Sequence, residues 1–211
     1  MILEKITALG SDGSRVMLHF SDGSKMRVPT TLVGDFGLYG GEELGEEALS
    51  ELMEAAQRAS AKARAMRIVS TTAISEQELN RRLQQKGERA QDAAEAVAWL
   101  KELGAVDDRA MAKRVVEKAI YKGYGENRIR QELYSKGIPR EYWDEALTDL
   151  PDMSDAIDKY LAQKLRGDID EKAIKRAADG LLRRGHSWGD ISSALRRYKE
   201  SLEDESILFE D

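Results

Sequence analysis

Alternating apolar and polar residues occupy the first thirty positions of the chain, and this alternation is the pattern of half-buried β-strands. It predicts strands over 2–9, 15–20 and 25–28. Asp12-Gly13 and Asp22-Gly23 separate the three stretches, and Asp-Gly is a strong hairpin signal because both residues tolerate positive φ. We therefore expect a small antiparallel meander. Three short strands cannot bury both faces, so the meander should pack on a helix.

A different period begins further along the chain. Residues 34–45 contain five glycines and predict a turn-rich connector, since the Gly-Lys-Ser/Thr of a phosphate-binding loop is absent. Between 46 and 69, apolar residues recur at the spacing of an amphipathic helix. The second half of this helix is basic, and we expect it to link the strands to the remainder of the chain.

The remainder of the chain contains an internal repeat. Three glycines, each after a basic residue, align at positions 87, 137 and 185. Apolar residues stand four and eight positions before each glycine, and an alanine stands nine positions after it; those four before are Leu83, Leu133 and Leu181. This spacing predicts a helix that ends at a left-handed glycine, followed by a second helix that packs back on the first.

Third helices are expected over 107–122 and 152–166, where apolar residues again share one helical face. The sequence thus predicts a mainly α-helical protein of tandem three-helix repeats, in which stacking covers the apolar surface that one repeat exposes. The expected domains are a β module with its connector at 1–45, a linking helix at 46–70, repeats at 71–123, 124–168 and 169–200, and a frayed acidic tail at 201–211.

Composition excludes several classes of protein. The 211 residues include no cysteine, which rules out disulfides, thiolate zinc sites and iron–sulfur clusters. No apolar run reaches the roughly 20 residues of a membrane helix, and the first residues lack a signal-peptide pattern. We therefore expect a cytoplasmic protein that does not bind membranes. We also expect a monomer, because no coiled-coil seam is present.

The sequence offers no constellation for catalysis. Its two histidines, His19 and His186, are too few for a histidine metal cage and do not support a hydrolytic triad. His19 falls in a predicted strand and His186 follows a helix-ending glycine, so we expect structural roles for both. The carboxylates are scattered over helix surfaces without an acid–base pair. We expect no enzymatic activity, no catalytic residue, no bound metal and no cofactor.

Charge is distributed unevenly along the chain. Residues 58–140 carry 18 basic and 11 acidic side chains, whereas the segments before and after are each net negative. Rows of cations at helical spacing stand in this basic middle, and such rows can neutralise phosphates by counterion release. They are equally usual on solvated helix surfaces. Five aromatic residues near the junction of the first two repeats either pack between repeats or form a binding surface with arginines. They are Tyr121, Tyr124, Tyr134, Tyr142 and Trp143.

Several segments resemble the RecX family of regulatory proteins. The longest runs from Gly125 to Ile138; others are the segment from Ser75 to Gly87, the turn at 104–108 and the stretch at 182–187. These motifs stand in the order of the family, and the connector at 38–44 is similar to an N-terminal extension of some members. The resemblance implies an elongated, curved body of three-helix repeats.

The same resemblance implies a function. RecX proteins associate with the filament that the RecA recombinase forms on single-stranded DNA, and they restrain its growth, ATP hydrolysis and strand exchange in recombination and DNA repair. We therefore expect a non-enzymatic regulator of RecA. Its candidate contact residues are Arg82, Lys86, Arg114, Lys118, Lys122, Arg128 and Arg130. The alternative is a single-stranded nucleic-acid-binding module without sequence preference or RecA dependence, which the net charge of −6 disfavours.

Overall fold

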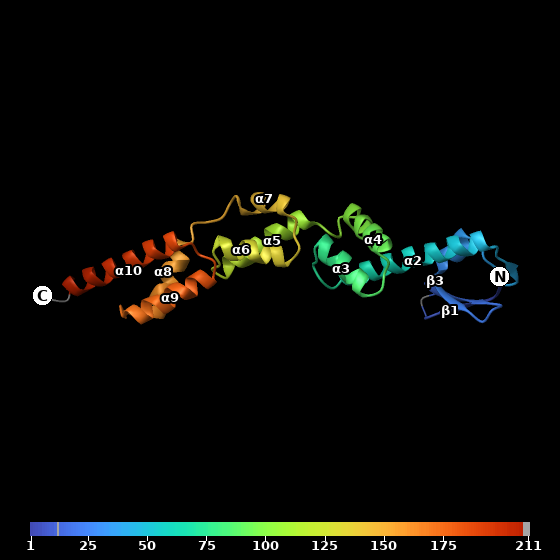
Figure 1. Ribbon diagram of the computed structural model, residues 1–211, viewed down its shortest axis with the longest axis horizontal. Helices are drawn as coiled ribbons and strands as arrows, with labels where there is room; N and C mark the ends of the chain where they lie inside the picture. Colours follow the sequence, from blue (N-terminus) through green and yellow to red (C-terminus); the bar gives the residue numbers. More distant parts are fainter. Residues whose placement is uncertain (12, 209–211) are drawn as a thin grey trace. The chain divides into compact units, whose positions relative to one another are not determined.

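The computed structural model describes residues 1–11 and 13–208, and the chain divides into two compact units, Met1–Asp107 and Asp108–Asp211 (Figure 1). Unit 1 contains β1 (Ile2–Leu9), β2 (Arg15–Phe20), β3 (Lys25–Pro29), α1 (Thr30–Asp35), β4 (Glu42–Glu43), α2 (Glu46–Val69), α3 (Glu76–Gln85) and α4 (Ala90–Glu102). Unit 2 contains α5 (Asp108–Tyr121), α6 (Glu126–Ser135), the 3-10 turn η1 (Arg140–Tyr142), α7 (Trp143–Leu147), α8 (Ser154–Leu165), α9 (Glu171–Arg183) and α10 (Trp188–Leu208). The predicted fold class, mainly helical with a small N-terminal antiparallel sheet, is confirmed.

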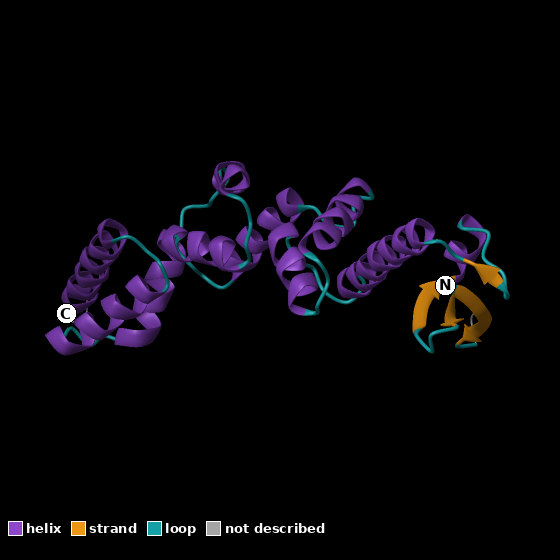
Figure 2. Ribbon diagram, turned by 45° about the vertical axis from the view of Figure 1, so that its right-hand side comes forward, coloured by secondary structure: helices purple, strands orange, loops and turns teal. Residues whose placement is uncertain are grey.

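The sheet has one strand more than the sequence predicts. Its order is β3-β2-β1-β4, and every pairing is antiparallel (Figure 2). Strand β4 lies inside the glycine-rich connector, where Glu43 pairs with Ile2. A two-residue strand lacks the alternating pattern that identifies longer strands, so its pairing partner rather than its own sequence defines it.

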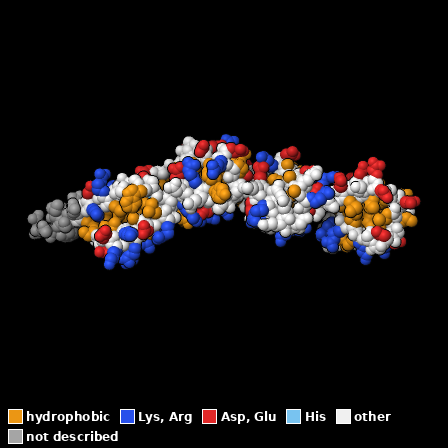
Figure 3. All heavy atoms as spheres, in the orientation of Figure 1, with side chains coloured by type: hydrophobic (Ala, Val, Ile, Leu, Met, Phe, Trp, Pro, Cys, Tyr) orange, Lys and Arg blue, Asp and Glu red, His pale blue; other side chains and the backbone are white. Residues whose placement is uncertain are grey.

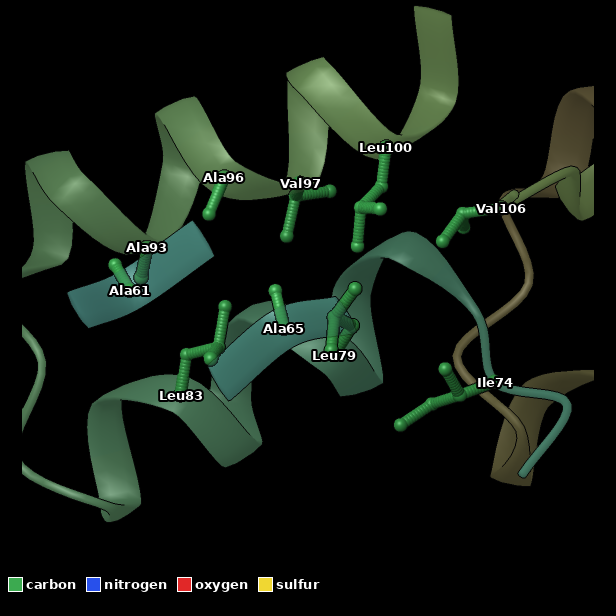
Figure 4. Packing of buried hydrophobic residues seen from close by; sticks show 10 residues of the cluster. All are labelled: Ala61, Ala65, Ile74, Leu79, Leu83, Ala93, Ala96, Val97, Leu100 and Val106. Atoms are coloured by element: carbon green, nitrogen blue, oxygen red, sulfur yellow. The ribbon is translucent and has the colours of Figure 1, made fainter. Parts of the chain in front are cut away.

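Helix α2 takes part in two hydrophobic cores. Its first half packs on the sheet, where Leu52 is fully buried with Leu3, Leu18 and Val28. Its second half packs on α3 and α4 through Ala61 and Ala65. Figure 4 shows these alanines of α2 between α4 and the leucines of α3. The small alanine side chains allow α2 to approach α3 and α4 closely. Because its 24 residues contribute to both cores, α2 joins the sheet to the first helical cluster.

The repeating glycines end their helices as predicted. Gly87, Gly137 and Gly185 have φ of 91°, 68° and 86°, in the left-handed region that favours glycine. The aligned residues Leu83, Leu133 and Leu181 are fully buried. The predicted helix start before α3 is also confirmed, because the Ser75 hydroxyl accepts a hydrogen bond from the Glu78 amide at 3.2 Å.

The grouping of the helices differs from the expected repeats by one helix. The predicted first repeat, 71–123, includes α5, but α5 buries Ala112 and Val116 in one cluster with residues of α6 and α7. Helix α2 supplies the third helix of the first cluster instead. The cause is that a helix between two pairs of helices can pack on the preceding or on the following pair. Its own apolar face does not indicate which pair will cover it. The three clusters are therefore α2–α4, α5–α7 and α8–α10.

The third cluster continues beyond the predicted end of its repeat. We expected the helix to end near Glu200 and the acidic tail to fray, but α10 runs to Leu208, and residues 209–211 lie outside the described part of the chain. Ile157, Leu161, Leu181 and Ile191 form the fully buried core of this cluster. Among the described residues, no helix is both long and apolar enough to cross a membrane.

Candidate interaction surface

A row of cations lies along α5, on the side away from its packed face. Ala112, Val116 and Ala119 are buried against α6 and α7, and the four-residue spacing leaves Arg114, Lys118 and Lys122 exposed. None of these three cations forms an ion pair within the described residues. Their charges are therefore available to an anionic partner.

The turn after α5 brings this row to α6. The Tyr124 ring lies 5.5 Å from Lys122 Nζ and 5.7 Å from Arg128 Cζ, so both cations contact one aromatic ring. Such cation–π contacts hold long side chains in place at a modest gain in free energy. We define Arg114, Lys118, Lys122 and Arg128 as the α5–α6 basic face.

The other candidate residues have different surroundings. Arg130 is paired with Glu126 at 2.7 Å, and Arg128 with Glu132 at 2.9 Å, each across one helical turn. On α3, Arg82 lies 2.9 Å from Glu78, which also binds Arg81 at 2.7 Å. The hydrogen bond from Arg81 is the main reason that the pKa of Glu78 falls to about 2. Glu78 thus stays ionised and partly neutralises Arg82.

The seven candidates consequently form two surfaces. Arg82 and Lys86 lie on unit 1, and Lys86 is exposed without an ion pair in the described residues. The other five lie on unit 2. Of the latter, Arg128 joins the row of α5 because its guanidinium and the Lys122 ammonium contact the same Tyr124 ring. Arg130 has its contact with Glu126 instead.

The turn between α9 and α10 contacts the N-terminus of α6, next to the α5–α6 basic face. The amides of Gly125 and Asn127 donate to the carbonyl oxygens of Arg184 and Gly185 at 2.9 and 3.2 Å. The approach is so close that a Cβ on Gly125 would lie 2.4 Å from the Gly185 carbonyl oxygen. The first glycine of the longest RecX-like segment is therefore required by a contact with residues some sixty positions away.

Two side chains of the same turn reach the α5–α6 loop. Arg184 Nη1 donates to the Lys122 carbonyl oxygen at 3.3 Å, and His186 Nε2 donates to that of Gly123 at 3.1 Å. His186 is buried, and burial lowers its pKa. The structural role expected for His186 agrees with these contacts. Arg184 is not among the seven candidate residues, although its position before Gly185 in the repeat marks this turn in the sequence.

The five aromatic residues divide into two groups. Trp143 is buried in the core of the α5–α7 cluster, where its indole donates to the Ile138 carbonyl oxygen at 2.9 Å, and the partly buried Tyr124 and Tyr142 pack against this core. Tyr121 and Tyr134 are instead 93% and 73% exposed. Tyr121 follows Lys118 by three residues and so extends the α5–α6 basic face with an exposed ring.

This surface supplies positive charge and exposed contact area. Within the described residues, no three side chains of His, Cys, Asp or Glu come together in a way that could hold a metal ion. The other histidine, His19, hydrogen-bonds with the Thr7 hydroxyl across two strands at 3.1 Å.

Comparison with known proteins identifies the family. Residues 107–147, which form α5, α6, η1 and α7, match the family description "RecX, second three-helix domain". The regulatory protein RecX of Cronobacter sakazakii is 33% identical over 151 residues, which cover 64% of this chain and 90% of that protein. The chain belongs to the RecX family. The matched domain begins at α5, in agreement with the helix grouping of the structure.

Further RecX proteins match nearly the whole chain. The regulatory protein RecX of Clostridioides difficile is 28% identical over 203 residues, or 93% of this chain and 95% of that protein. A crystal structure of a regulatory protein RecX aligns with a TM-score of 0.72 at 23% identity, over 92% of this chain and 98% of that one. RecX from Lactobacillus salivarius aligns with a TM-score of 0.58 at 18% identity, over 67% and 96%. At these identities the two structures show a shared fold.

Proposed function

We propose that this chain is a non-enzymatic regulator that binds the RecA filament on single-stranded DNA and inhibits filament growth, ATP hydrolysis and strand exchange. The observation that carries the proposal is membership of the RecX family, whose related proteins bear the name regulatory protein RecX. RecA as the partner is what the resemblance to this family implies. The proposal places the chain in the cytoplasm, with RecA.

The α5–α6 basic face is our candidate for the filament contact on unit 2. Arg114, Lys118 and Lys122 can meet DNA phosphates or acidic RecA side chains without first breaking an internal ion pair. Tyr121 adds a ring that is 93% exposed, and tyrosine and arginine are the residue types that most often dominate binding energy at interfaces. Arg82 and Arg130 would have to exchange Glu78 and Glu126 for the new partner.

The first experiment measures RecA ATP hydrolysis on single-stranded DNA while this protein is titrated far below the RecA concentration. We expect strong inhibition at that ratio, because a protein that caps or bridges the filament affects many RecA subunits at once. Inhibition that begins only when the protein equals the available DNA sites would mean simple competition for the strand, and the proposal would fail.

A second experiment tests the surface itself. The variant Arg114→Ala/Lys118→Ala/Lys122→Ala removes three charges from exposed positions, and we expect weaker filament binding with an unchanged circular dichroism spectrum. The matched control is Lys172→Ala/Lys175→Ala/Arg176→Ala, which removes the same charge from exposed positions of α9. If both variants inhibit RecA as well as the parent chain does, the three cations of α5 do not contribute to filament binding and serve only to keep the helix surface hydrated.

The second candidate function is sequence-independent binding of single-stranded nucleic acid without RecA. Arg114, Lys118 and Lys122, which form no ion pair in the described residues, favour it because Lys and Arg supply most of the affinity for phosphates. It predicts affinity for a bare strand that falls steeply with salt and does not increase when RecA is added. A filament ligand should instead bind much better to the strand once RecA covers it.

A further inference from the structure

The register of the N-terminal sheet collects its basic residues on one face. The pairs Lys5↔His19 and His19↔Lys25 lie across the three long strands, and Leu9↔Arg15 and Met17↔Arg27 lie on the same face. Alternate residues point to opposite faces of a strand. Val16, Leu18, Phe20 and Val28 are buried against α2 on the other face, so these basic residues point away from the core.

All the lysines and arginines of residues 1–57 belong to this one face. They are Lys5, Arg15, Lys25 and Arg27. The same segment contains ten acidic residues, but none of them lies in β2 or β3, and Glu43, which pairs with Ile2, lies in β4 at the opposite edge of the sheet. None of the four cations forms an ion pair in the described part of the chain. An acidic segment thus carries a locally cationic surface.

Helix α2 extends this surface beyond the edge strand β3. Arg15 and Arg27 line a cavity of about 210 Å³ together with Arg64 and Arg67 of α2. Arg64 donates to Glu88 at 2.5 Å, whereas Arg67 is exposed and has no ion pair among the described residues. Figure 3 shows blue side chains gathered beside the sheet on the side of α2. Four arginines from three separate elements therefore converge at this border.

We propose that this cationic sheet face, formed by Lys5, Arg15, Lys25, Arg27 and Arg67, binds the sugar–phosphate backbone of nucleic acid. Neighbouring cations without counter-charges repel one another, and a chain of phosphates relieves this repulsion while it releases its own counterions. The binding surface belongs to the β module and does not depend on the proposed contact of α5 and α6 with a RecA filament.

The chemistry of the face favours nucleic acid over an acidic protein. Protein interfaces obtain most of their binding energy from a few aromatic or large apolar anchors in a desolvated centre. The paired positions of this face contain no Phe, Tyr or Trp within the described residues; their largest apolar side chains are Leu9 and Met17. The one imidazole at these paired positions, that of His19, is hydrogen-bonded to the Thr7 hydroxyl, so the face lacks the row of aromatic rings on which successive bases stack. Binding should accordingly be independent of base sequence and strongly dependent on salt.

The test uses the full chain and a fluorescein-labelled oligothymidylate, with fluorescence anisotropy measured over a range of salt concentrations. In Arg15→Gln/Lys25→Gln/Arg27→Gln, the loss of three phosphate contacts should lower the affinity at 0.1 M salt by at least about tenfold and reduce the slope of log K against log salt by about 2. The control Lys172→Gln/Lys175→Gln/Arg176→Gln should bind like the parent. The variant Arg15→Lys/Lys25→Arg/Arg27→Lys keeps the charges and should bind nearly as well.

Two results would overturn the proposal. One is an unchanged affinity and salt slope in the folded Gln variant, with folding checked by circular dichroism and thermal unfolding. The other is equal affinity of the parent chain for polyglutamate and for the oligonucleotide at equal charge, which would identify an acidic protein as the partner. A Gln variant that failed to fold would shift the test to Arg67→Gln, for which a loss of affinity and a smaller salt slope are expected and parental binding would count against the proposal.

Discussion

Replacing Gly125 with alanine tests the contact that joins the two helical clusters of unit 2. The new Cβ would lie 2.4 Å from the Gly185 carbonyl oxygen and 2.6 Å from the His186 amide nitrogen. Both are backbone atoms, which cannot rotate away as the end of a side chain can. The turn between α9 and α10 must therefore move, and the hydrogen bonds from the amides of Gly125 and Asn127 would lengthen or break.

The expected cost follows from these two effects. Overpacking a close contact costs about 1–3 kcal/mol, and each of the two hydrogen bonds contributes about 1 kcal/mol. We therefore expect a loss of about 3 kcal/mol in the free energy of opening between the clusters. Because about 1.4 kcal/mol corresponds to a factor of ten, hydrogen exchange at the protected amides of α6 and α9 should become about a hundredfold faster.

Hydrogen exchange with mass spectrometry measures this effect segment by segment in the full chain. The matched control is Gly45→Ala, since Gly45 caps α2 with φ −66° and ψ 166°, whereas Gly125 caps α6 with φ −76° and ψ 167°. A Cβ on Gly45 would meet nothing within 4 Å. If Gly125→Ala accelerates exchange in α6 no more than Gly45→Ala does in α2, the close approach contributes no free energy and the reasoning is refuted.

Two further predictions concern the stability of unit 2. Leu133 is fully buried, so Leu133→Ala should lower the free energy of unfolding by about 3–5 kcal/mol and speed hydrogen exchange in α5–α7 before α2–α4; uniform acceleration would contradict the division into clusters. Because burial holds the pKa of His186 below its ordinary 6.5, the unfolded chain binds the proton first as the pH falls, and the stability of unit 2 should be full above about pH 6.5 and decline below it. His186→Gln should remove most of the decline between pH 7.5 and 5.5 in urea unfolding, and an equal decline in both proteins would argue against it.

Local patterns predicted the elements of this fold well, because local physics decides them. Gly87, Gly137 and Gly185 adopt the left-handed conformation that any helix end of this type requires. The assignment of α5 to a cluster was wrong for a different reason. Its apolar pattern does not say which neighbouring pair of helices will cover it, and only the packed structure shows that α6 and α7 do.

In the candidate site, too, contacts within one helix can be read from residue spacing, whereas contacts between distant residues cannot. Spacing alone identified Arg114, Lys118 and Lys122 as one row. The ion pair of Arg130 with Glu126, four residues earlier, was not predicted. The contact of Arg184 with the Lys122 carbonyl spans 62 positions and leaves no local signal. The cationic sheet face could have been predicted from the sequence, because the alternation of its strands places Arg15, Lys25 and Arg27 on one side.

The two cores shared by α2 impose an order on folding during synthesis. The strands β1 to β3 leave the ribosome before Leu49 and Leu52 of α2, which complete the core of the sheet. Ala61 and Ala65 of the same helix stay exposed until α3 and α4 have been synthesised. Chains fold from the N-terminus as they emerge, and contacts between near neighbours form fastest. Unit 1 should consequently assemble in two steps along the growing chain, with α2 finishing the first and starting the second.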